Sequence, residues 1–71
     1  MEKNPQPGVY RHYKGRIYRL CGLAQHSETL EMMAVYHPEG NPDDLWVRPL
    51  AMWSELVEKD GVLIPRFTHI P

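Results

Sequence analysis

Four consecutive polar residues have the side-chain types from which a small hydrolytic or binding site could be built: His26, Ser27, Glu28 and Thr29. They separate two apolar runs that are each typical of a strand. Successive side chains of an extended chain point to opposite sides, so Ser27 would point away from His26 and Glu28. A catalytic triad would therefore need a partner from another strand. The alternative is a turn in which the Ser27 and Thr29 hydroxyls bond to the backbone.

Two arginines, Arg48 and Arg66, each lie beside a proline in the sequence. Proline stiffens the backbone, and a guanidinium that is held in one direction is a good receptor for a carboxylate or a phosphate. The alternative is an ion pair inside the fold. For that case we predict that Glu28 is the partner of Arg48 or Arg66, with Glu31 as the other candidate carboxylate.

Residues 10–19 interleave tyrosines with cations, and three of them complete the predicted basic face: Arg11, Tyr13 and Arg16. Sites for single-stranded nucleic acid combine rings on which bases stack with cations that bind phosphates. The alternative is a strand pair with its tyrosines packed inward and its cations in solvent. Trp46 is the last candidate ligand-binding residue. At least one of Trp46 and Trp53 should lie in the core, and an exposed Trp53 would favour a groove for proline-rich peptides.

The charges are unevenly placed, although the formal net charge is only −1. Residues 1–27 contain five cations and one acid, whereas residues 28–71 contain three cations and eight acids. The near-neutral total argues against strong, general binding of nucleic acid, while the basic first part allows a local basic face.

The chain has one cysteine and four well-separated histidines, so we predict no zinc site and no cofactor. Cys21 lies in an apolar run and is expected to be a small buried hydrophobe in a reducing, cytoplasmic setting. No apolar run approaches the roughly 20 residues that a membrane-spanning helix needs. We therefore expect no membrane partner.

The pattern of short apolar runs and turn residues predicts an all-β fold, a small SH3-like barrel of about five short strands with one short helical turn. Residues 1–7 are expected to be a disordered tail, and residues 8–71 a single domain. Ile17, Cys21 and Leu23 share one parity and should line one face, with a bend or bulge at Gly22. The expected elements are strands at 9–13, 16–24, 30–37, 45–48 and 66–70, a helical turn within 50–57, and a hairpin around Asp60-Gly61 that joins 56–58 to 62–64. A helix is the alternative for 30–37.

Four blocks of the sequence, in order, resemble the short bacterial proteins grouped as domain of unknown function 1653. The resemblance extends from about Gly8 to Ile70 and implies an SH3-type barrel, but it implies no activity. The residues that carry it are 8–15, 24–31, Trp46-Val47-Arg48-Pro49 with Met52, and Gly61 with Pro65-Arg66-Phe67.

We interpret the chain as an uncharacterised cytosolic binding or adaptor module, with single-stranded nucleic acid or a nucleotide-like molecule as the candidate ligand. One alternative is a protein-interaction subunit of a larger assembly. The partner is expected to be a nucleic acid or a protein or peptide, and the chain to be a monomer or weak homodimer. Another alternative is a small hydrolase or transferase that uses His26 and Glu28 with a nucleophile such as Ser54 or Thr68. We prefer the binding module to the enzyme, because a chain of 71 residues leaves little room for a deep catalytic pocket.

Overall fold

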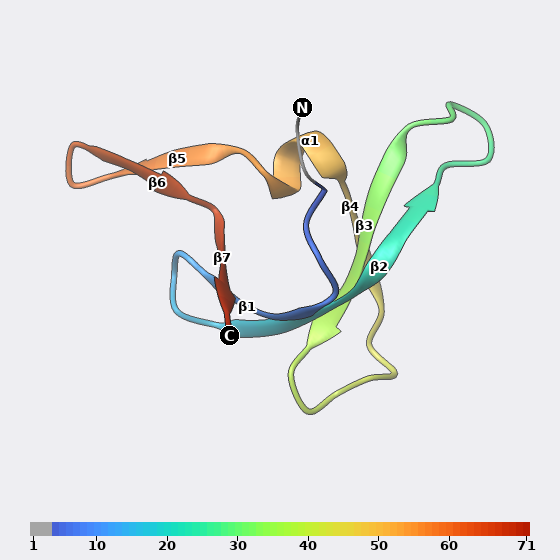
Figure 1. The fold of residues 1–71 in the computed structure, drawn as a ribbon, viewed down its shortest axis with the longest axis horizontal. Helices are drawn as coiled ribbons and strands as arrows, with labels where there is room; N and C mark the ends of the chain where they lie inside the picture. The colour runs from blue at the N-terminus through green and yellow to red at the C-terminus, as the bar shows by residue number, and fades with distance from the viewer. Residues whose placement is uncertain (1–3) are drawn as a thin grey trace.

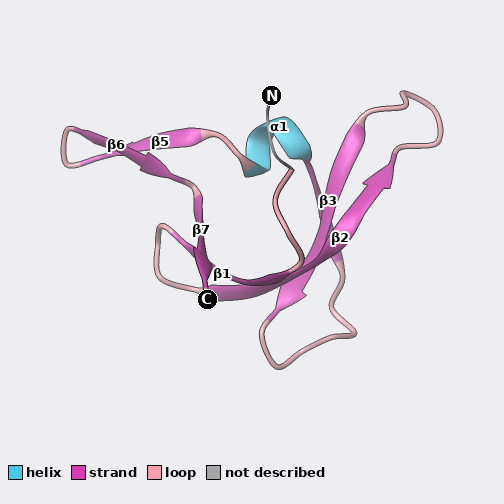
Figure 2. Cartoon of the chain, in the orientation of Figure 1, coloured by secondary structure: helices cyan, strands magenta, loops and turns pink. Residues whose placement is uncertain are grey.

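The computed structural model describes residues 4–71 and is built almost entirely from strands. Five strands form one antiparallel sheet in the order β4-β3-β2-β1-β7 (Figure 1). Two further strands form a separate hairpin, and one short helix precedes it (Figure 2). The elements are β1 (Gly8–His12), β2 (Ile17–Gln25), β3 (Met32–Pro38), β4 (Trp46–Pro49), α1 (Leu50–Trp53), β5 (Leu56–Lys59), β6 (Val62–Pro65) and β7 (Phe67–Ile70).

The predicted all-β class with one short helical turn is confirmed, and β3 is a strand rather than the alternative helix. The helical turn is shorter than its apolar spacing suggests, because it ends after Trp53 and the chain is extended again from Leu56. The predicted hairpin turn is present, with positive φ at both Asp60 (54°) and Gly61 (79°). Such φ values give a turn whose twist matches that of the two strands it joins.

The predicted disordered tail lies partly outside the described residues, which begin at Asn4. Residues 4–7 form neither helix nor strand, and the Gln6 carbonyl accepts a hydrogen bond of 2.7 Å from the Tyr10 hydroxyl. Among the described residues, no helix is long and apolar enough to cross a membrane.

The β-bulge in β2 corrects two predictions. The pairing of β2 with β3 shifts between Leu20 and Gly22, so the bulge at Gly22 is confirmed. The shift places Leu20 and Leu23 on the same side of the sheet, where both pack in the core with Tyr18. Cys21 lies at the bulge and is exposed, so the predicted buried Cys21 and the predicted Ile17-Cys21-Leu23 face are wrong.

The core lies on the inner face of the sheet and is mostly aromatic. Trp53, from α1, stacks on Phe67 of β7 with ring centroids 3.7 Å apart and planes 6° apart. β4 and β7 are the two edges of the sheet and do not pair with each other, so the sheet is curled but open, and α1 covers its inner face. The buried apolar residues are Tyr10, Leu20, Ala34, Tyr36, Trp53 and Phe67.

Candidate functional site

The polar segment between β2 and β3 is a turn that satisfies its own backbone. The His26 Nδ1 atom accepts hydrogen bonds from the backbone N–H groups of Glu28 (3.1 Å) and Thr29 (3.3 Å). The Thr29 hydroxyl accepts a bond of 3.2 Å from the N–H of Glu31, and Leu30 closes the turn with a φ of 65°. The predicted backbone bond is therefore confirmed for Thr29, whereas the imidazole of His26 rather than Ser27 holds the rest of the turn.

Glu28 pairs with neither arginine, so the predicted internal ion pair is wrong. In residues 4–71 the ion pairs join Arg19 to Glu39 (3.0 Å) and Arg66 to Glu55 (2.6 Å). The sequence could not show this arrangement, because Glu55 becomes a neighbour of Arg66 only where the chain returns from the β5–β6 hairpin. Within the same residues no side-chain hydroxyl bonds to His26, so the structure does not bring together the groups that the hydrolase interpretation needs.

The basic β1–β2 hairpin divides its residues between the two faces of the sheet. Tyr10 is buried in the core, and Tyr18 is half-buried directly opposite it. Arg11 lies opposite Ile17, on the outer face, and is exposed. The tyrosines of these two strands therefore belong to the core, as the alternative interpretation states, and Tyr10 is not free to stack on a ligand.

The turn of this hairpin places cations against rings. The Lys14 ammonium lies 5.9 Å from the ring centroid of Tyr13, and the Arg16 guanidinium lies 5.6 Å from that of Tyr18. Both distances are within the range in which a cation is attracted to the face of an aromatic ring. Lys14 and Arg16 remain exposed, so their charges are available at the rim of the inner face.

The guanidinium of Arg48 lies over the aromatic rings of the inner face of the sheet. Arg48 lies on β4 opposite Ala34, and its guanidinium carbon is 5.6 Å from the ring centroid of Phe67. Its Nε atom makes a long contact of 3.4 Å with the Tyr36 hydroxyl. Within the described part of the chain, its terminal nitrogens hydrogen-bond to no protein atom, and no buried side-chain nitrogen or oxygen lacks a partner. The free N–H groups of Arg48 therefore face solvent.

His12 lies on the same inner face and has an available proton donor. Its Nδ1 accepts a hydrogen bond of 3.2 Å from the Lys14 backbone N–H, which leaves the proton of the neutral ring on Nε2. Its ring lies 5.1 Å from that of Phe67. Burial first, and then the positive charges of Arg48, Arg66 and Lys14, lower the pKa of His12 below its ordinary value of 6.5.

Trp46 extends this surface along β4. It lies directly opposite Tyr36, so both rings are on the same side of the sheet, and it is two residues from Arg48 on the same strand. Its side chain is 52% exposed, whereas Trp53 is buried in the core. We call this surface the Arg48 face and define it by His12, Tyr18, Trp46 and Arg48 together with the buried rings of Tyr36 and Phe67 beneath them.

The predicted site residues therefore separate into three groups. Arg48 and Trp46 belong to the Arg48 face, and Tyr13 and Arg16 lie at its rim through their contacts with His12 and Tyr18. Arg66 is already occupied, because it binds the Glu55 carboxylate and the Met52 carbonyl. Arg11 lies on the outer face, and the turn at 26–29 lies beyond the opposite end of β2 from Arg16.

Four members of the Arg48 face were not named as ligand-binding residues: Tyr36 and Phe67, and also His12 and Tyr18, which lie within the predicted basic stretch at 10–19. The alternation of a strand places His12 on the same side as Tyr10, so the period of two could have identified it as an inner residue. No signal in the sequence indicates that the guanidinium of Arg48 reaches Phe67, which is 19 residues further along the chain.

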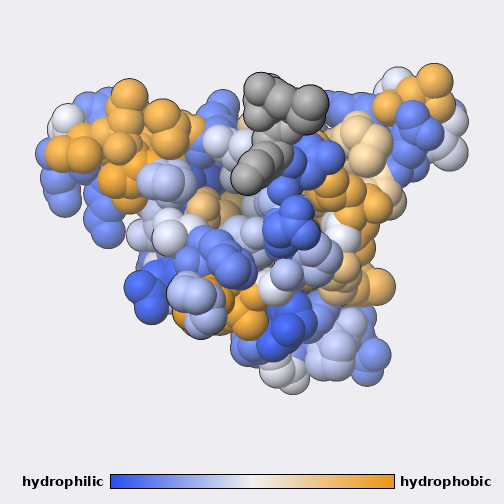
Figure 3. Space-filling view, viewed as in Figure 1, coloured by the Kyte–Doolittle hydropathy of each residue, from blue (hydrophilic) through white to orange (hydrophobic). Residues whose placement is uncertain are grey.

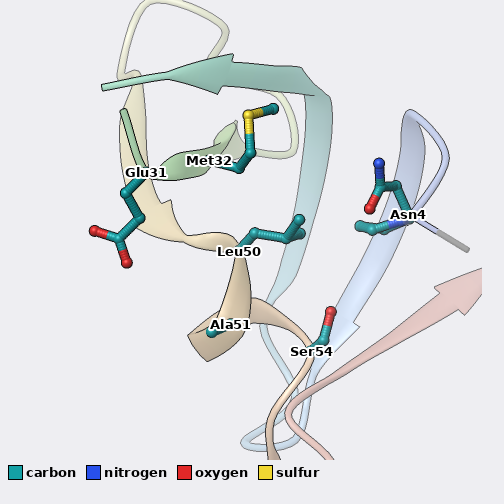
Figure 4. A pocket seen from close by; sticks show the side chains of 7 residues that line it. Asn4, Glu31, Met32, Leu50, Ala51 and Ser54 are labelled. Carbon is teal, nitrogen blue, oxygen red and sulfur yellow. The ribbon is translucent and has the colours of Figure 1, made fainter. Parts of the chain in front are cut away.

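A separate hollow of about 360 Å³ lies between the N-terminal segment, the start of β3 and α1 (Figure 4). Its lining is mostly apolar, and Glu31 is its one titratable side chain. The residues around it are Asn4, Pro5, Glu31, Met32, Leu50, Ala51 and Ser54.

Comparisons with known proteins agree on one family. The family model described as "Protein of unknown function (DUF1653)" matches residues 8–69. A crystal structure of a protein of that family from Bordetella bronchiseptica is similar to this chain, with 38% sequence identity and a TM-score of 0.85. The similarity covers 94% of this chain and 88% of that chain. No curated protein matches the chain.

Proposed function

We propose that this chain, which belongs to the DUF1653 family, is a cytoplasmic binding module for a ligand that carries both phosphate and an aromatic ring. Short single-stranded nucleic acids and nucleotides share this chemistry. The Arg48 face is the proposed binding surface, with Tyr13 and Arg16 at its rim. The turn at 26–29 and Arg11 are not part of the proposed site.

The observation that carries the proposal is the state of Arg48. Its guanidinium is held against Phe67 and Tyr36, yet no carboxylate among residues 4–71 neutralises it. A guanidinium on an aromatic face loses little freedom when an anion binds, because its direction is already set. Its terminal N–H groups can then bond to two oxygens of one phosphate in parallel.

The neighbouring groups favour a phosphate over a carboxylate ligand. His12 can donate its Nε2 proton, and Lys14 and Arg16 add positive charge at the rim of the same face. The terminal phosphate of a nucleotide or of a 5′-phosphorylated oligonucleotide is a dianion with three oxygens and uses several such donors at once, whereas the two oxygens of a carboxylate are satisfied by Arg48 alone.

Trp46 supplies the surface for the ring of the ligand. Its side chain is largely exposed and lies on the same side of β4 as Arg48, with one residue between them. Residues with this spacing in a strand are roughly 7 Å apart, which is close to the separation of a base and its phosphate. Stacking of a base on an exposed ring contributes roughly 1–3 kcal/mol and tolerates every base.

The test is a titration of the isotope-labelled protein with a 5′-phosphorylated four-nucleotide oligothymidylate at low salt, followed by NMR shifts of the backbone amides and of the Trp46 indole N–H. We expect shifts at His12, Trp46 and Arg48 that reverse as the salt concentration rises, because phosphate contacts release counterions. Inorganic phosphate should shift His12 and Arg48 but leave Trp46 unchanged.

Two matched variants distinguish binding at the Arg48 face from general electrostatic attraction between the protein and the oligonucleotide. Arg48→Gln and Arg11→Gln each remove one positive charge, but from opposite faces of the sheet. Arg48→Gln should weaken binding about tenfold or more, because it removes a charge-assisted pair of bonds, and Arg11→Gln should have little effect. Equal losses of oligothymidylate affinity in the two variants, or the absence of NMR shifts in the parent protein, would refute the proposal.

A further inference from the structure

The β5–β6 hairpin, which we call the arm (residues 56–65), projects from the rest of the chain. Figure 1 shows it extending away from the five-stranded sheet, and β5 and β6 pair only with each other. A lone two-stranded hairpin is marginally stable in water, because it has no third strand or helix on which to bury its side chains. The arm therefore needs a surface to pack against.

One face of the arm is mostly apolar, although solvent surrounds it. Leu56 and Leu63 are 54% and 66% exposed. Leu56 pairs with Pro65, and Glu58, two residues after Leu56, pairs with Leu63. Side chains two residues apart in a strand lie on the same side, so all four share one face of the hairpin. Figure 3 shows apolar residues gathered over this projection. Three of these four residues are apolar and Glu58 is the exception, whereas a hairpin face that stays in solvent carries mostly polar residues.

β4 presents a second apolar surface. Val47 of β4 is 60% exposed and lies opposite Val35, on the outer side of the sheet, while Trp46 and Arg48 point to the inner side. β4 is also an edge of the sheet, with backbone groups on one side that pair with no strand in the described residues. An open, apolar edge is a template for another chain.

One copy of the chain exposes more surface than a compact protein of the same mass. Its accessible area is 5234 Å², about 660 Å² more than a compact chain of 8.3 kDa should have. Its radius of gyration of 12.4 Å likewise exceeds the roughly 11 Å expected for 71 residues. The excess area is close to the roughly 800 Å² that each partner buries in a stable complex.

We propose that a second copy of this chain covers both surfaces, with the arm of each copy docked on the outer side of β4 of the other. A two-fold pair buries both apolar surfaces of each copy in one closed contact, whereas a single foreign partner would have to fit two dissimilar surfaces. The inner side of β4, with Arg48 and Trp46, stays open in this arrangement. The inference is thus independent of the proposed ligand.

Sedimentation velocity of the full chain tests the proposal. We expect a species of twice 8.3 kDa at micromolar concentration. Leu63→Lys on the arm and Val47→Lys on β4 should each weaken the dimer at least tenfold, because each places a charge in an apolar contact. Thr68→Lys is the control. Thr68 is also exposed and on the outer side of the sheet, but it lies on β7, and its substitution should leave the dimer intact.

Three results would overturn the proposal. The parent chain could remain a monomer at high micromolar concentration, the dimer could persist in Leu63→Lys, or Leu63→Lys could dissociate it while Val47→Lys does not. Far-UV circular dichroism of each variant verifies folding, and both substituted side chains are exposed, so the fold should tolerate a lysine at either position.

Discussion

The turn at 26–29 and the Arg48 face show how differently two polar groups of residues can be used in one small domain. In the turn, the side chains of His26 and Thr29 bond to backbone groups only a few residues away. On the Arg48 face, the guanidinium packs on rings from distant strands and keeps free N–H groups. The turn has the residue types of a catalytic site but uses them for local structure.

The difference indicates where to look for function in a small fold. The His26 and Thr29 side chains each spend an acceptor on their own turn and keep one donor, so part of their hydrogen-bonding capacity is already used locally. A cation without a carboxylate on an aromatic surface retains most of its capacity. We therefore regard unmet hydrogen-bonding capacity, rather than residue type, as the better guide, and three further experiments test that distinction.

The largest difference between the Arg48 face and the turn is expected in the free energy of unfolding. Phe67 is buried, stacks on Trp53 and supports Arg48, so Phe67→Ala should lower the free energy of unfolding by about 3–5 kcal/mol. Thr29→Val removes one exposed bond and should lower it by roughly 0.5–1 kcal/mol. Urea unfolding followed by far-UV circular dichroism measures both values. Similar losses of unfolding free energy in the two variants would mean that the turn and the Arg48 face contribute equally to stability, contrary to the comparison.

A loss of stability of intermediate size is expected when His26 of the turn is replaced. His26→Ala removes the acceptor of two backbone N–H groups and should cost about 1 kcal/mol of stability without changing oligothymidylate affinity. His26→Asn should recover most of the loss, because the amide oxygen of asparagine occupies nearly the position of the histidine Nδ1. Weaker oligothymidylate binding in a folded His26→Asn protein would place the turn in the binding site and contradict the comparison.

The smallest effect is expected in the titration of His12. Burial and the charges of Arg48, Arg66 and Lys14 lower its pKa in the folded state, so the unfolded chain takes up this proton at a higher pH than the folded chain. The contribution of His12 to stability is therefore present above pH 6.5 and is lost as the pH falls from 6.5 towards the folded pKa.

Arg48→Gln should raise the pKa of His12, as measured by NMR of the ring proton, because it removes one of the positive charges that disfavour the imidazolium. Lys59→Gln is the control. Lys59 lies on the arm and is not among the charges that affect His12, so its removal should leave the pKa unchanged. An unchanged pKa in Arg48→Gln would show that the two side chains do not share one face.

Local patterns predicted most of the elements correctly. Asp60-Gly61 gave the hairpin turn, Gly22 marked the bulge, and the resemblance to DUF1653 is confirmed. The errors came from contacts between distant segments. The bulge reversed the faces of β2 and exposed Cys21, and Glu55 rather than Glu28 became the partner of an arginine.

The sequence by itself determined the all-β class, the strand and turn positions and the set of candidate cations, because these depend on φ preferences and on a side-chain period that acts over a few residues. Only the tertiary structure decided which cations meet rings. It placed Arg48 over Phe67, left the turn at 26–29 apart, buried Trp53 and exposed Trp46. The physical reason is that the curl of the sheet and its one-residue bulge set the neighbours of each side chain, and both arise from the pairing of whole strands.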